Sequence, residues 1–185
     1  MHRLFVALDF PADIKERLTT LCCGLPGARW VAPEHIHLTI RFIGEVDSQV
    51  FQTVREVLTE VRCKPFSLRL EGVGFFPPRG KPRVVWAGIT PSDHLYQLRN
   101  RIESILVRTG LEPEGRKYSP HITLARLNNT PSSKVGAFLS HNSFFRTDEF
   151  QVNAFLLYSS VLSSKGAKHY VEEVYPFKFG FSGGN

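Results

Sequence analysis

Two short stretches decide the fold of this 185-residue chain: residues 35–42 read HIHLTIRF and residues 119–125 read SPHITLA. Polar and apolar residues alternate in both, which is the period of a β-strand with one buried face. Residues two apart on a strand point to the same side, roughly 7 Å from each other. His37 and Thr39 are therefore expected to share one face, and so are His121 and Thr123. The apolar residues beside them, Phe42 included, are expected to face a core.

The rest of the chain predicts alternating strands and helices with short connections, which indicates an α+β fold. A proline-rich stretch at 75–83 is read as a loop between two strands. Strands are predicted at 4–8, 30–46, 66–73, 84–89, 119–125, 150–159, 170–175 and 177–181, and helices at about 12–22, 48–61, 92–108 and 132–139.

Both halves of the chain show one order of elements: a histidine-bearing strand, a helix and two further strands. Such a repeat would bring the two motif strands together around a pseudo-twofold axis. A length of 185 residues with 42% apolar content suffices for one large core. We therefore expect a single domain over residues 1–185, divided into two closely packed lobes of antiparallel sheet with helices outside.

Composition limits the class of protein and its location. The formal charge of +6 and the pI of about 9.4 favour polyanionic partners such as nucleic acid, although a solvated basic surface explains them equally well. Three cysteines, two of them adjacent, fit neither a disulfide framework nor a zinc site. The first apolar run is broken by Asp9 and Pro11, so no signal peptide or membrane span is predicted. We expect a cytoplasmic monomer.

The repeated His-x-Thr pattern suits in-line displacement at phosphorus, where a nucleophile enters opposite the departing oxygen. Two histidines serve this reaction because an imidazole with a pKa near 6.5 acts as either base or acid near neutral pH. A threonine hydroxyl beside each ring can donate a hydrogen bond to a phosphate oxygen. One such match means little, but two in matching strands, one in each half, favour His37, Thr39, His121 and Thr123 as a catalytic set.

Neighbouring residues raise further hypotheses. Strict alternation places Arg41 on the face of His37, where it would steady a phosphate. The same rule points Arg126 away from His121, unless a β-bulge turns it back. His35 and His37 form an H-x-H pair like those of some metal sites, but no matching ligands follow, so no metal is expected. His169 has no motif context and is expected to be structural or exposed.

The two motifs and their surroundings resemble the RNA 2′,3′-cyclic phosphodiesterase family, also called 2′-5′ RNA ligase, within the two-histidine phosphoesterase superfamily. The resemblance spans nearly the whole chain and rests on RLFVALDFPADIKERL, RWVAPEHIHLTIRFIGEV, GVGFFPPRGKPRVVWAGI and YSPHITLAR. It implies a bilobal fold with a central cleft and no metal or organic cofactor. It also implies hydrolysis of RNA 2′,3′-cyclic phosphate ends to 2′-phosphomonoesters, and in some members reversible joining of 2′-5′ linkages in RNA such as tRNA halves.

By motif position, His37 resembles the donor of a proton to the leaving 3′ oxygen and His121 the base that activates water. Thr39 and Thr123 resemble the hydroxyls that hold the phosphate. The sequence leaves open which ring carries the proton. It also leaves open an RNA-binding module that holds such ends without reacting, and the same pair acting on ADP-ribose 1″,2″-cyclic phosphate or a 2′-5′ oligoadenylate.

Overall fold

The first sheet joins strands from both ends of the chain. In the computed structural model, which describes residues 1–163 and 166–178, its order is β10-β9-β1-β3 and every pair is antiparallel. Its strands are β1 (His2–Leu8), β3 (Leu38–Val46), β9 (Ala154–Ser163) and β10 (Gly166–Pro176). The first motif thus lies at an edge of this sheet, on β3.

The second sheet carries the second motif in an inner strand. Its antiparallel order is β2-β7-β6-β5. Its strands are β2 (Ala28–Trp30), β5 (Leu70–Phe76), β6 (Val84–Ile89) and β7 (Ile122–Leu127). A short ladder of β4 (Phe66–Leu68) and β8 (Phe150–Val152) completes the strand pairing of the described residues.

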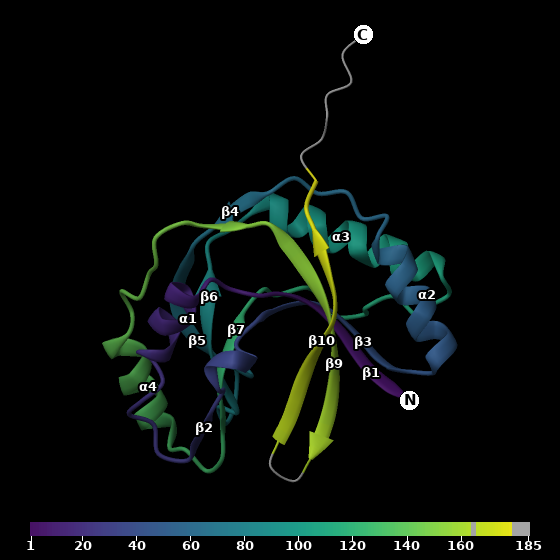
Figure 1. Cartoon of the computed structure of the whole chain (residues 1–185). Helices are drawn as coiled ribbons and strands as arrows, with labels where there is room; N and C mark the ends of the chain where they lie inside the picture. Colours follow the sequence, from purple (N-terminus) through teal and green to yellow (C-terminus); the bar gives the residue numbers. More distant parts are fainter. Residues whose placement is uncertain (164–165, 179–185) are drawn as a thin grey trace.

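Helices cover the outside of the two sheets (Figure 1), as their apolar faces require. Helix α2 begins after Asp47, whose carboxylate accepts a hydrogen bond of 2.8 Å from the Val50 amide. Helix α3 begins after Ser92, whose hydroxyl oxygen accepts a hydrogen bond from the Leu95 amide. The helices are α1 (Ala12–Thr19), α2 (Ser48–Leu58), α3 (Asp93–Arg108) and α4 (Ser132–His141), with a 3₁₀ turn η1 at Pro33–His35. Among the described residues, no helix is long and apolar enough to cross a membrane.

The predicted repeat is confirmed: β3, α2, β4 and β5 are followed by β7, α4, β8 and β9 in the same order. The β4–β8 pair joins equivalent strands of the two halves. Each four-stranded sheet nevertheless takes strands from both halves. The first combines β1 and β3 with β9 and β10, and the second combines β2, β5 and β6 with β7.

Several predicted strand limits were wrong. The single strand predicted at 30–46 is interrupted, because Pro33 opens η1 and pairing resumes only at Leu38. His37 lies one residue before β3, and His121 likewise lies one residue before β7, rather than inside the strands. Of the strand predicted at 177–181, residues 177–178 follow the end of β10 and residues 179–181 lie outside the described residues.

The main core runs through both sheets as one cluster of buried side chains. Strand β1 is buried on both faces, so its alternate residues serve different clusters. Leu4, Val6 and Leu8 belong to the main core. Phe5 and Ala7 instead join Leu156 and Tyr158 of β9 in a second, smaller cluster on the opposite face of the first sheet. The first motif lies on this second face.

Candidate active site

The two motif histidines are held by the same local hydrogen bond. His37 Nδ1 lies 2.7 Å from the carbonyl oxygen of His35, and His121 Nδ1 lies 2.8 Å from that of Ser119. Since a carbonyl only accepts, each Nδ1 carries a hydrogen. In the neutral ring Nε2 is then the free lone-pair nitrogen, ready to take a proton. The two motifs therefore present chemically equivalent imidazoles.

Although they belong to different sheets, the two motif strands are neighbours near the centre of the molecule (Figure 1). Cα atoms of β3 and β7 approach within 8 Å of each other. The Tyr118 hydroxyl, three residues before His121, donates a hydrogen bond of 3.2 Å to the carbonyl of Thr39. The segment leading into the second motif is thus tied directly to the first.

A β-bulge follows Thr39 and reverses the alternation of β3. Ala7 pairs with Thr39 and Phe5 with Phe42, with a register shift on β3 between them. Because Phe5 and Ala7 share a face, Thr39 and Phe42 share it too. Phe42 is 56% exposed there, so the prediction that it points into a core is wrong.

The same bulge shows that Arg41 was wrongly placed on the face of His37. Arg41 pairs with Val6, a main-core residue, and is only 7% exposed. Its Nε lies 2.5 Å from Glu103 Oε2 on α3, and Nη1 lies 3.5 Å from Glu114 Oε2. Its guanidinium also donates to the carbonyl of Glu112. Arg41 is an internal anchor between β3, α3 and the segment that leads to the second motif.

A matching bulge in β7 turns Arg126 toward the second motif. Trp86 pairs with Thr123 and Val84 with Arg126, again with a register shift between them. Val84 and Trp86 are two apart on β6 and share a face, so Thr123 and Arg126 share it as well. Arg126 is exposed. Arg126 therefore points as expected for a strand with a β-bulge, and not as strict alternation would place it.

Aromatic rings surround both motif histidines. His37 lies 4.9 Å from the Phe5 ring centroid and 5.9 Å from that of Tyr158, and His169 meets it at 5.4 Å and 89°. His121 lies 4.8 Å from Phe76. His169 was missed because no local pattern marks it. It comes here only because β10 pairs with β9, which in turn pairs with β1.

Comparison with known proteins identifies the chain. The model of the LigT like phosphoesterase family matches residues 8–86 and 88–169. The chain belongs to this family.

Relatives and solved structures agree with that assignment. The chain is 34% identical to the RNA 2′,3′-cyclic phosphodiesterase of Archaeoglobus fulgidus, over 89% of this chain and 94% of that one. It is also 34% identical to the Thermotoga maritima enzyme of the same name, over 89% of each. Escherichia coli LigT superposes with a TM-score of 0.79 in its apo form and 0.78 in complex with 3′-AMP, at 27% and 26% identity over 96% of this chain and 98% and 99% of that one. The fold is the α+β fold of the two-histidine phosphoesterases.

In this LigT like phosphoesterase the two histidines have different surroundings. The pKa of His37 is lowered to about 4, chiefly by burial and in smaller part by the charges of His169 and His35. The hydrogen bond to the His35 carbonyl and the charge of Asp9 oppose this shift. Burial, His35 and Arg3 also lower the pKa of His169. At pH 7 His37 is therefore neutral in the free phosphoesterase.

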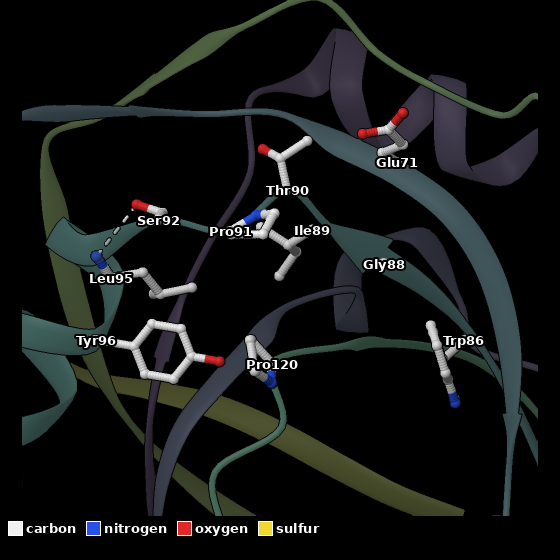
Figure 2. Close-up of a pocket in the computed structure, with 10 residues that line it drawn as sticks. All are labelled: Glu71, Trp86, Gly88, Ile89, Thr90, Pro91, Ser92, Leu95, Tyr96 and Pro120. Carbon is white, nitrogen blue, oxygen red and sulfur yellow. Dashed lines mark hydrogen bonds between the residues drawn. The ribbon is translucent and has the colours of Figure 1, made fainter. Parts of the chain in front are cut away.

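A pocket of about 360 Å³ borders the second motif of the phosphoesterase (Figure 2). Pro120, which directly precedes His121, lines it together with Trp86, whose ring lies 6.4 Å from the His121 ring. Figure 2 shows Tyr96 directed toward Pro120 and Ser92 capping the first turn of α3. The volume of this pocket is in the range of small-molecule sites. Among the described residues, no three His, Cys, Asp or Glu side chains are grouped to hold a metal ion.

Proposed function

We propose that this LigT like phosphoesterase hydrolyses the 2′,3′-cyclic phosphate at the end of an RNA, giving a 2′-phosphomonoester, with His37 and His121 as the acid–base pair. The observation that carries the proposal is the pair of matching Nδ1-to-carbonyl hydrogen bonds directly before two neighbouring strands of different sheets. The names of the relatives, and the 3′-AMP complex of E. coli LigT, agree with a nucleotide phosphate as substrate.

In the proposed reaction, one imidazole takes a proton from water while the water oxygen bonds to phosphorus. The bond from phosphorus to the 3′ oxygen breaks, and the other ring, as imidazolium, gives its proton to that oxygen. The Thr39 and Thr123 hydroxyls donate to the non-bridging oxygens. With a 5′ hydroxyl in place of water, the same two proton transfers would form a 2′-5′ linkage, and in cleavage of that linkage the acid and base would exchange roles.

The lowered pKa of His37 bears on which histidine acts as the base and which as the acid. A neutral ring is the form that a base requires, so His37 is ready as the base before substrate binds. To act as the proton donor, the role implied by family resemblance, His37 must first gain a proton as the anionic phosphate approaches. The pH dependence of kcat/KM reports the pKa values of the free enzyme, and it therefore tests whether His37 titrates near 4.

Replacement of either histidine by alanine tests the proposal. His37→Ala and His121→Ala should each lower kcat for a 2′,3′-cyclic phosphate roughly 10²- to 10⁴-fold, because each removes one proton transfer. The exposed His141, in the last turn of α4, provides the control His141→Ala, which should keep full activity. Near-normal turnover by either motif variant would contradict the proposal.

The substrate and setting are parts of the same proposal: RNA such as tRNA halves, a monomer of one domain over residues 1–185, and the cytoplasm. The excess of basic side chains and the three free cysteines support it. A panel containing an RNA cyclic end, ADP-ribose 1″,2″-cyclic phosphate and a 2′-5′ oligoadenylate should favour the RNA. Binding of that RNA without any product would indicate a binding module instead.

A further inference from the structure

Two arginines lie directly opposite each other beside the second motif. Arg29 on β2 pairs with Arg126 on β7, and both are exposed. The next pair along, Trp30 and Ala125, belongs to the side of the sheet that packs on the main core. Arg29 and Arg126 therefore project from the opposite side, which Arg126 shares with Thr123.

This pair is electrostatically unfavourable in the absence of a ligand. Like charges directly opposite on neighbouring strands destabilise a sheet. Within residues 1–163 and 166–178, neither guanidinium forms a hydrogen bond or an ion pair with a protein group. Lys81 adds a third positive charge at the same end of β7, because its Nζ is held 2.9 Å from Asn129 Oδ1 in the turn after the strand. An anion between these side chains would remove the repulsion.

The position of the pair selects the kind of anion. Arg126 follows Thr123 by three residues, one of which the bulge absorbs, so its Cα lies roughly 7 to 10 Å farther along β7. A phosphate held by Thr123 and another held by the arginines would therefore be separate groups. The planar guanidinium forks of arginine match phosphate oxygens in bidentate geometry.

We propose that Arg29 and Arg126 bind the 5′ phosphodiester of the terminal nucleotide while its cyclic phosphate lies between the motifs. The inference rests on the proposed function and narrows it. The preferred substrate is then the end of an RNA chain, and a nucleoside 2′,3′-cyclic phosphate that lacks a 5′ phosphate is a poor one.

The test compares two substrates and three variants. The substrates are adenosine 2′,3′-cyclic phosphate and a short oligoadenylate with the same cyclic end. Arg29→Gln should raise KM for the oligonucleotide roughly tenfold or more, the cost of a lost charged hydrogen bond, and leave KM for the mononucleotide unchanged. The dependence of log KM on log salt should become shallower by about 0.7 for the oligonucleotide. Arg29→Lys should keep that salt slope, and Arg17→Gln, an exposed arginine on α1, should change nothing.

The outcomes separate the two proposals. If the unaltered protein hydrolyses neither substrate, the proposed function fails. If it hydrolyses both but Arg29→Gln changes neither KM, or raises both equally, the hydrolase assignment stands and the second phosphate site is rejected.

Discussion

At the scale of single residues, His37 shows how burial prepares an imidazole. Its ring lies among Phe5, Tyr158 and His169, and this apolar, partly closed setting lowers its pKa to about 4. The Nδ1 bond to the His35 carbonyl resists the shift and orients the ring. His37 therefore keeps its Nε2 lone pair at pH values where an unfolded histidine is half protonated.

This depressed pKa predicts a pH-dependent contribution to stability. The unfolded chain takes a proton on His37 as pH falls through about 6.5, and the folded protein does not until about 4. Stability from this group is thus fully present above pH 6.5 and is lost between 6.5 and 4. Between pH 7 and pH 5 the loss should be at most roughly 2 kcal/mol. Urea unfolding at both values should show a smaller loss for His37→Gln, and equal losses would contradict the assigned cause.

At the scale of elements, two equivalent bulges organise the motif strands. Each bulge falls just after the motif threonine. The next side chain on the face of that threonine is therefore three residues later in sequence, and not two. That position holds Phe42 on β3 and Arg126 on β7. On β3 the residue turned inward is Arg41, whose charge is met by Glu103 of α3.

The Arg41–Glu103 pair should therefore contribute to stability and not to phosphate binding. Arg41→Met should lower the free energy of unfolding by about 2 to 3 kcal/mol, because Glu103, only 14% exposed, loses its short ion pair and keeps only the 3.8 Å contact with Arg99 and the Glu114 amide. Adding Glu103→Leu should restore part of that loss. The control is Arg108→Met, which breaks the exposed pair with Glu60 and should cost less than about 1 kcal/mol. Urea unfolding measures all of them, and a cost for Arg41→Met as small as that of the control would refute a structural role.

At the scale of the whole molecule, the two halves of the chain exchange strands. Each four-stranded sheet is built from both halves, so neither half has a complete sheet of its own.

The exchange predicts one cooperative unfolding transition. Both tryptophans, Trp30 on β2 and Trp86 on β6, lie in the second sheet, so their fluorescence reports that lobe, while far-ultraviolet circular dichroism reports the whole chain. The two urea transitions should coincide, as for a two-state protein. Separate midpoints would indicate two lobes that unfold independently.

The sequence alone determined whatever depends on local period. Alternation predicted the motif strands and the shared face of each histidine–threonine pair, and the helices predicted at 48–61 and 92–108 are found as α2 and α3. The tertiary structure decided which way Arg41, Phe42 and Arg126 point, and that His169 joins His37. The physical reason is that a bulge is a property of two paired strands, and a contact such as that of His169 depends on which distant strand is the neighbour. Neither is encoded in the period of one segment.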